Sequence, residues 1–383
     1  AAALREGHVV AFPTETVYGL GGSALSAHAA HSIFAAKGRP ADNPLIVHIA
    51  SLDMLAPLLP PDFRLSPALH ALAQLWPAPL TLLFPAGPGI PRQVTAGHRT
   101  VGIRMPAHAV ARALIAAAGV PLAAPSANAS GRPSPTTAAH VAHDLGGEQG
   151  RLPFILDGGA ASLGVESTVV DAISVPGEVH VLRPGACTVD DLRTALAAAG
   201  VQARLRVYGQ ADQAAEGAVL RDVQMEQNPT TPGMKYRHYA PDAKVVLLKP
   251  TAGAATSLRD LLESLASRST DAHVGLMLPS DGALSASLRQ LCPQDDASSS
   301  SATSTLLAPP ARLELSAAQH CTLHRFDLGS IARPAEAAAR LFDGLRTLDQ
   351  LDHCDVILVE AVEEQGVGLA VMNRLNKAAG EQV

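Results

Sequence analysis

A lysine and an arginine two residues apart carry the strongest chemical signal in the sequence. Lys37 is the only lysine in the first 234 residues, and Arg39 follows it in the run Ala-Lys-Gly-Arg-Pro. A lysine ammonium is compact and rotatable, whereas an arginine guanidinium is a planar fork of donors, so together they can grip several phosphate oxygens. The pair indicates nucleotide chemistry and makes Lys37 and Arg39 the candidate catalytic residues.

The glycine-rich phosphate loops of the common nucleotide-binding folds are absent from the sequence. Gly19, Gly21 and Gly22 lack the G-x-G-x-x-G spacing, and no G-x-x-x-x-G-K-[ST] run occurs. We therefore expect phosphates to be bound by side chains and by amides at helix starts.

Two polar segments follow apolar runs, where α/β folds often place their sites. The first is Phe12-Pro-Thr-Glu-Thr-Val-Tyr-Gly-Leu-Gly, and the second is Pro125-Ser-Ala-Asn-Ala-Ser-Gly-Arg-Pro-Ser-Pro-Thr. Each segment taken alone is also explained as a decorated strand end or an ordinary loop. The same holds for Arg104, Ser167 and Arg183, which stand at the ends of apolar runs, where a salt bridge is the commoner explanation.

The sequence gives little support for a metal site or for a serine hydrolase. His28 with His31, and His140 with His143, have helical spacing but no further ligand nearby, so no protein metal site is predicted. The four cysteines form no C-x-x-C pair, and no G-x-S-x-G elbow occurs.

Composition limits the partners of the chain. With 383 residues, 47% hydrophobic content, a net charge of −6 and a pI of about 6.2, it is a globular protein without a broad basic face. We expect no membrane segment, no stable nucleic-acid binding and a cytoplasmic location. The sequence starts at Ala1 without methionine, and we expect the natural chain to begin earlier.

The pattern of elements predicts an α/β protein with two domains and a linker. Short β-rich runs mixed with helical patterns such as 27–37 and 189–198 predict a layered domain over 1–206. The proline-rich stretch around 228–241 predicts a linker over 207–241. Strands and helices alternate afterwards, so 242–383 is predicted to be a smaller, Rossmann-like parallel-sheet domain.

Taken together, the motifs strongly resemble the YrdC-like family. The resemblance rests on Pro13-Thr-Glu-Thr-Val-Tyr-Gly-Leu-Gly, Lys37-Gly-Arg-Pro, Ser126-Ala-Asn-x-Ser-Gly, Ser167-Thr-Val-Val-Asp and Arg183-Pro-Gly, in this order. The run Pro232-Gly-Met-Lys-Tyr-Arg-His-Tyr-Ala-Pro and the added domain are similar to the longer, two-domain branch. The fold implied is a twisted mixed-sheet domain with an open groove, followed by the Rossmann-like domain.

The resemblance implies that the chain makes L-threonylcarbamoyladenylate from L-threonine, bicarbonate and ATP, with Mg²⁺ accompanying the ATP and pyrophosphate released. A threonylcarbamoyl transferase acting on tRNA would use the product. Threonine would be held by Thr16, His48, Arg104 and Ser167. The residues implied for ATP are Lys37, Arg39, Asn43, Thr100, Ser126, Asn128, Ser134, Arg183, His238 and Tyr239.

One departure from the family concerns the position after Gly-Leu-Gly, where the family often has an acidic residue and this chain continues Gly22-Ser23-Ala24. We also expect the linker around His238 and Tyr239 to fold over the nucleotide and exclude water. The alternative is an RNA-binding module without synthase activity, which the acidic net charge and the 3% aromatic content disfavour.

Overall fold

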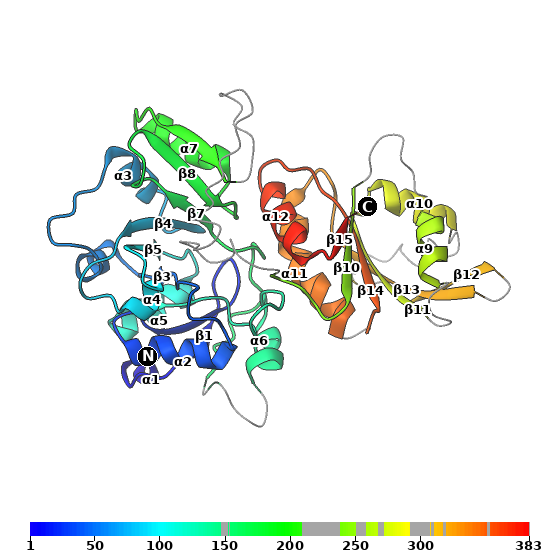
Figure 1. Cartoon of the computed structure of the whole chain (residues 1–383), viewed down its shortest axis with the longest axis horizontal. Helices are drawn as coiled ribbons and strands as arrows, with labels where there is room; N and C mark the ends of the chain where they lie inside the picture. The colour runs from blue at the N-terminus through cyan, green and yellow to red at the C-terminus, as the bar shows by residue number, and fades with distance from the viewer. Residues whose placement is uncertain are drawn as a thin grey trace. The chain divides into compact units, whose positions relative to one another are not determined.

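One mixed β-sheet organises the first part of the computed structural model (Figure 1). Contacts divide the chain into two units, Ala1–Tyr236 and Arg237–Val383. The structure describes residues 1–146, 152, 154–208, 238–249, 258–266, 272–291, 307, 310–316, 319–350 and 353–382. Most of the predicted linker lies outside these residues, so its boundaries stay a prediction.

The first unit contains a nine-stranded sheet among its described residues. Its order is β1-β2-β6-β3-β5-β4-β7-β8-β9, with parallel and antiparallel neighbours. The strands are Val10–Phe12 (β1), Gly19–Ser23 (β2), Val47–His48 (β3), Leu80–Pro85 (β4), Thr100–Arg104 (β5), Leu122–Ala123 (β6), Thr168–Asp171 (β7), Glu178–Arg183 (β8) and Arg204–Val207 (β9).

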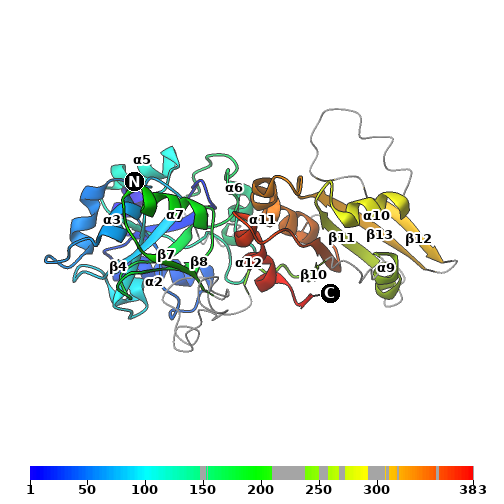
Figure 2. The ribbon, with the colours of Figure 1, turned by 90° about the horizontal axis from the view of Figure 1, so that it is seen from above.

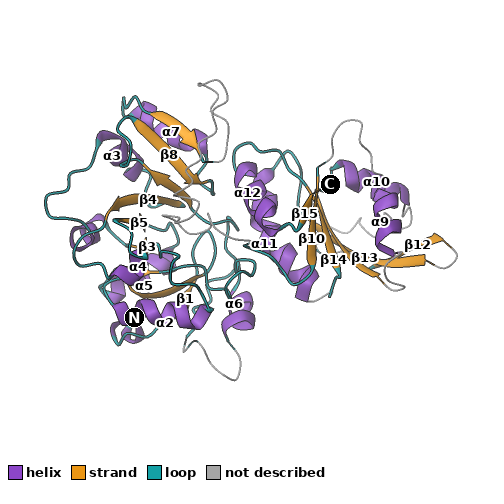
Figure 3. Ribbon diagram, in the orientation of Figure 1, coloured by secondary structure: helices purple, strands orange, loops and turns teal. Residues whose placement is uncertain are grey.

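Helices of the first unit surround this sheet (Figure 3). They are Ala2–Arg5 (α1), Ala27–Lys37 (α2), Pro67–Ala73 (α3), Arg92–Thr95 (α4), Ala109–Ala118 (α5), Ala138–Leu145 (α6) and Val189–Ala198 (α7), with a 3₁₀ helix at Leu52–Leu58. Local capping explains several boundaries. The Ser26 hydroxyl accepts from the Ala29 amide at the start of α2, and Gly38 ends that helix with a left-handed φ of 61°.

The strand register places polar residues of distant segments in one row. His48 pairs with Arg104, and Arg104 pairs with Thr81 on its other side. The row continues from Thr81 to Val169 and from Val169 to Arg183. Because directly paired residues share a face of a sheet, β3, β5 and β4 present His48, Arg104 and Thr81 together.

Strand β2 depends on glycine because Phe12 packs directly on it. A Cβ atom at Gly21 would lie 2.7 Å from Cε1 of Phe12, and one at Gly19 would lie 3.3 Å from Cζ of the same ring. Phe12 is fully buried. The glycines, which usually weaken a strand, thus allow the ring of β1 to sit against its neighbour.

The second unit contains a six-stranded sheet with the order β12-β13-β11-β14-β10-β15. Its pairs are parallel except for β12 with β13. The strands are Lys244–Leu248 (β10), Ala272–Leu278 (β11), Ala311–Ser316 (β12), Gln319–Asp327 (β13), Val356–Glu360 (β14) and Glu381–Gln382 (β15). The helices are Leu258–Ala266 (α9), Ala283–Leu291 (α10), Pro334–Gln350 (α11) and Gly368–Ala378 (α12).

Helices cover both faces of this sheet, as expected for a doubly wound unit. Leu276 and Leu278 of β11 belong to a buried cluster that includes Leu262 of α9 and Leu288 of α10. Met277, between them, faces α11, because a Cβ atom at Gly344 would lie 2.7 Å from its Cε. Figure 2 shows α11 and α12 side by side, apart from α9 and α10.

The α/β fold predicted from the sequence is confirmed. The helices predicted over 27–37 and 189–198 have the predicted bounds. Two strands of the first unit, the glycine-rich β2 and the short β9, were not predicted. Outside the named strands, Ile155 forms an isolated bridge with Ala11.

No helix within the described part of the chain combines the length and apolar character that crossing a membrane requires.

The contact between Phe12 and Gly21 gives a test of the fold. We expect Gly21→Ala to lower the free energy of unfolding by about 1–3 kcal/mol, because the new methyl group meets a fully buried ring. Urea unfolding of Gly21→Ala, Phe12→Leu and the double variant would measure it. The double variant should recover part of the loss, since leucine leaves more room. Additive losses would show that the two residues do not interact.

Candidate functional site

A tight turn after β1 presents the first polar residues of the site. The Thr14 hydroxyl oxygen accepts from the amides of Thr16 and Val17, at 3.2 and 3.3 Å, and the hydroxyl donates to the Val17 carbonyl at 2.6 Å. Such a hydroxyl-closed turn fixes the backbone locally. It holds Glu15 and Thr16 toward the end of β5.

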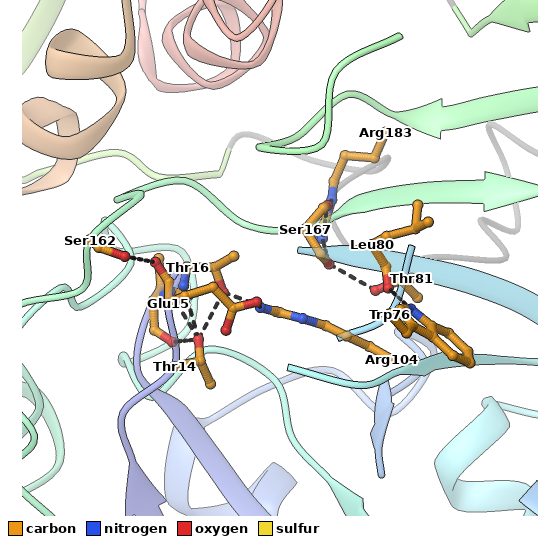
Figure 4. A network of polar contacts seen from close by, with 11 residues as sticks. Thr14, Glu15, Thr16, Trp76, Leu80, Thr81, Arg104, Ser162, Ser167 and Arg183 are labelled. Atoms are coloured by element: carbon orange, nitrogen blue, oxygen red, sulfur yellow. Dashed lines mark hydrogen bonds and ion pairs between the residues drawn. The ribbon is translucent and has the colours of Figure 1, made fainter. Parts of the chain in front are cut away.

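Arg104 joins this turn to the polar row of the sheet (Figure 4). Its Nη2 donates to Oε1 of Glu15 at 2.5 Å, and its Nη1 donates to the Thr16 hydroxyl at 2.9 Å. The Arg104 and Glu15 side chains are only 5% and 9% exposed. The ion pair offsets the cost of burying both charges, because an isolated buried charge would lose its hydration without gaining a new interaction.

The ion pair leaves two buried atoms without hydrogen bonds. Oε2 of Glu15 and Nε of Arg104 have no hydrogen-bond partner. Burial alone would raise the pKa of the Glu15 carboxyl group, but the charge and hydrogen bond of Arg104 hold that pKa below its ordinary value. Glu15 is therefore a carboxylate with one oxygen still able to accept.

His48 adds a neutral polar group beside Arg104. Burial, reinforced by the positive charge of Arg104, lowers the pKa of His48 to about 3. Nδ1 of the ring lies 3.2 Å from the Ile46 carbonyl oxygen, and a neutral ring must donate there. Its Nε2 is consequently the acceptor nitrogen.

Ser167 lies between the side chains of Thr81 and Arg183 (Figure 4). Its hydroxyl oxygen is 2.8 Å from that of Thr81 and accepts from Nη2 of Arg183 at 3.2 Å. The same Nη2 donates to the Ser167 carbonyl at 2.8 Å. Gly185 makes this arrangement possible, since a Cβ atom there would lie 2.4 Å from the Ser167 carbonyl carbon.

Lys37, the last residue of α2, holds the polar loop that follows β6. Its Nζ donates to the carbonyls of Ser126 and Asn128, at 2.5 Å each, and to Oδ1 of Asn128 at 3.4 Å. The lysine is 3% exposed. The structure thus brings together Lys37, Ser126 and Asn128 through contacts that position the loop.

Arg39 contacts residues that follow it closely in the sequence, whereas Ser134 contacts a residue 32 positions away. Nη2 of Arg39 donates to the Pro44 carbonyl at 3.1 Å, and its Nε lies 3.4 Å from the Asn43 carbonyl. The Ser134 hydroxyl, which is fully buried, donates to Oε1 of Glu166 at 2.6 Å.

The remaining predicted ATP residues include Thr100, His238 and Tyr239. Thr100 begins β5 and is four residues from Arg104 along the strand, a distance of about 13 Å. His238 and Tyr239 belong to the second unit. Tyr239 is only 2% exposed, and its ring packs 5.3 Å from that of Phe342. Nucleotide contact by these three residues stays a prediction.

The residues predicted to hold threonine are linked to one another through Arg104 and Thr81. Arg104 contacts Thr16 directly, His48 pairs with Arg104 in the sheet, and Ser167 touches Thr81, which also pairs with Arg104. Sequence reasoning assigned no site role to Glu15, Thr81 or Glu166. Glu15 stood within a recognised motif, whereas Thr81 could be found only from the strand register.

The described residues offer no protein cage for a metal. No group of three or more His, Cys, Asp or Glu side chains with suitable spacing occurs among them.

Comparison with known proteins covers the whole chain. Residues 2–185 match the Sua5/YciO/YrdC family model, described as "Telomere recombination", and residues 187–380 match "Threonylcarbamoyl-AMP synthase, C-terminal domain". The chain is 39% identical to the threonylcarbamoyl-AMP synthase of Pyrococcus abyssi, over 99% of this chain and 93% of the relative. It is also 39% identical to that of Bacillus subtilis, over 100% and 92%.

Solved structures extend the likeness to the fold. The crystal structure of P. abyssi Sua5 complexed with L-threonine matches with a TM-score of 0.75 and 37% identity, covering 100% of this chain and 94% of that one. A P. abyssi Sua5 variant with a histidine and the tyrosine after it changed to alanine matches equally, with 93% of that chain covered.

The neutral state of His48 predicts a pH dependence of stability. Because the unfolded histidine binds a proton near pH 6.5 and the folded one only near 3, stability is lost as the pH falls through this window. The cost should be about 2 kcal/mol between pH 7 and 5, since each pH unit is worth about 1.4 kcal/mol.

Urea unfolding of the wild type and of His48→Asn at pH 7 and 5 measures this cost. Asparagine keeps a donor for the Ile46 carbonyl but does not titrate, so the variant should lose less stability on acidification. Equal losses in the two proteins would contradict a buried neutral His48.

Proposed function

This chain belongs to the Sua5/YciO/YrdC family, and we propose that it makes threonylcarbamoyl-AMP from L-threonine, bicarbonate and ATP, releasing pyrophosphate. It is a threonylcarbamoyl-AMP synthase and thus a nucleotidyl-transferring enzyme. One observation carries the proposal: a chain that is 39% identical to such a synthase over nearly its full length has a buried arginine among Thr16, His48 and the Thr81–Ser167 pair.

The N–H donors of Arg104 can bind the carboxylate of threonine. Its guanidinium has five N–H groups, of which Glu15 and Thr16 each engage one, so others can hold the threonine carboxylate. The hydroxyls of Thr16 and Ser167 and Nε2 of His48 can orient the remaining polar atoms of the substrate. A complex with L-threonine is known for the P. abyssi relative.

Ten residues are proposed to bind ATP, and among them Lys37 contacts Ser126 and Asn128. The proposed set comprises Lys37, Arg39, Asn43, Thr100, Ser126, Asn128, Ser134, Arg183, His238 and Tyr239. The cationic members would attract the triphosphate, and the neutral amides and hydroxyls would orient the base and ribose. Magnesium, bound to the phosphates, would neutralise charge on the departing pyrophosphate.

The reaction joins two anions, which explains the need for local positive charge. The neutral threonine amine forms a C–N bond with carbon dioxide to give a carbamate and a proton, or with bicarbonate to give a carbamate and water. A carbamate oxygen then forms a bond to the α-phosphorus of ATP while the bond to the pyrophosphate oxygen breaks. Lys37 and Arg39 would stabilise the charge that develops on the phosphates. Arg104 would keep the threonine carboxylate in place.

The linker predicted over 207–241 would close the site against water, because carbamates are easily lost in water. His238-Tyr239 is the only His-Tyr pair of the chain, and the solved P. abyssi variant alters such a pair. Residues 232–237 of this segment lie outside the described residues. We place the reaction in the cytoplasm, with a tRNA threonylcarbamoyl transferase consuming the product. An RNA-binding role without synthesis is not favoured by any contact of the site.

The activity is tested with labelled bicarbonate, L-threonine, ATP and magnesium. We expect a labelled adenylate whose formation requires threonine and is accompanied by an equal amount of pyrophosphate. Chromatography of the quenched mixture would detect both. Pyrophosphate release without threonine, or no labelled adenylate, would contradict the proposed reaction.

Two substitutions test whether Lys37 acts on ATP and Arg104 on threonine. Lys37→Ala should abolish ATP turnover, because it removes a cation and the support of the Ser126–Asn128 loop. Arg104→Ala should mainly raise the KM for threonine. Steady-state kinetics with each substrate varied would separate the effects, and equal changes for ATP and threonine in both variants would contradict this assignment.

A further inference from the structure

Two buried polar atoms of the candidate site make no hydrogen bond. They are Oε2 of Glu15, which belongs to a negatively charged carboxylate, and Nε–H of Arg104, which belongs to a positively charged guanidinium. A buried polar atom without a hydrogen bond is costly and rare, so each such atom needs an explanation. Oε1 of Glu15 and the Nη atoms of Arg104 make the contacts that join the turn to β5, and the backbone amides of Ala107 and Glu15 also favour the charged form of the Glu15 carboxyl group, but Oε2 and Nε take no part in the Glu15–Arg104 contact.

An α-amino acid offers the complementary pair of groups. Its carboxylate accepts hydrogen bonds and is negative, while its ammonium donates and is positive, on the adjacent carbon. We propose that Glu15 receives the α-amino group of threonine through Oε2, while Arg104 receives the carboxylate. This inference rests on the proposed function, because it concerns the substrate of the same site.

The geometry supports a direct role for Glu15 beyond support of Arg104. A carboxylate that served only to hold the guanidinium could use both oxygens in a bidentate contact, which is the common arrangement of such pairs. Here only Oε1 lies at 2.5 Å from Nη2, and Oε2 is left over. The backbone of the Thr14 turn fixes this placement, because Thr14 and Thr16 are hydrogen-bonded to each other and to the turn.

The contact would persist during the reaction. Threonine binds with an ammonium group, which donates to the carboxylate. After a carbamate has formed, the same nitrogen keeps one N–H, which can donate to the same oxygen. Glu15 would therefore hold the reacting nitrogen in one place before and after carbamate formation. It would also disfavour carboxylic acids that lack the amine, because Oε2 would then be left without a hydrogen bond.

Calorimetric binding of two ligands tests the proposal. L-Threonine and (R)-3-hydroxybutyrate share the carboxylate and hydroxyl group, but only threonine has the amine. We expect the wild type to bind threonine roughly ten-fold or more tightly than the other acid, as a charge-assisted hydrogen bond implies. Glu15→Gln should remove most of this preference, weakening threonine while leaving 3-hydroxybutyrate within about three-fold of its original affinity.

Matched variants separate this role from a structural one. Glu178→Gln changes a carboxylate of the same unit that bonds to His180, and neither affinity should move. Glu15→Asp keeps the negative charge but shortens the side chain by one methylene group. It should therefore lower the affinity for threonine more than the affinity for 3-hydroxybutyrate. This variant carries the test if Glu15→Gln does not give the wild-type circular dichroism spectrum.

Equal weakening of both ligands by the Glu15 variants would overturn the proposal, because Glu15 would then act only by orienting Arg104. A wild type that binds both acids equally would also overturn it. A wild type that binds no threonine would instead refute the proposed function itself, so the two failures are distinguishable.

Discussion

The register of the first sheet is the constraint on which the candidate site depends. Four segments far apart in the sequence supply His48, Arg104, Thr81 and Arg183, and backbone pairing alone aligns them. Because side chains alternate between the two faces of a strand, a slip of one residue in β5 would turn Arg104 to the other face. The buried apolar residues that alternate with these polar ones, such as Ile103 and Leu82, oppose such a slip.

Charge within the site is balanced locally. The whole chain is acidic, yet the site contains Lys37, Arg104 and Arg183, each less than 5% exposed. Backbone carbonyls hold Lys37, a carboxylate holds Arg104, and the Ser167 backbone and hydroxyl hold Arg183. The positive charge of Arg104 also helps to keep His48 neutral. Strand β5 therefore presents a cation, and the neighbouring strand β3 presents an uncharged acceptor. Such preorganised groups can bind anions without first being dehydrated.

Sequence patterns predicted the fold where local signals were strong. The α2 helix carries a serine cap at its start and a glycine after its end, and its bounds were predicted to the residue. The β2 strand was missed because three of its five residues are glycine, whose role there is to accommodate Phe12. In the second unit the sequence indicated parallel strands, but it could not show that β14 lies between β11 and β10. Motifs identified Thr16, Arg104 and Ser167, whereas the contribution of Thr81 emerges only from pairing across the sheet.

The central claim is that threonine binds over the row formed by His48, Arg104 and Thr81 in the first unit. A crystal structure of this chain with L-threonine and a non-hydrolysable ATP analogue tests it most directly. The account predicts the threonine carboxylate on the Arg104 guanidinium, with the α-phosphate of the analogue facing the amine. Threonine bound elsewhere, with Arg104 still contacting only Glu15 and Thr16, would contradict the account.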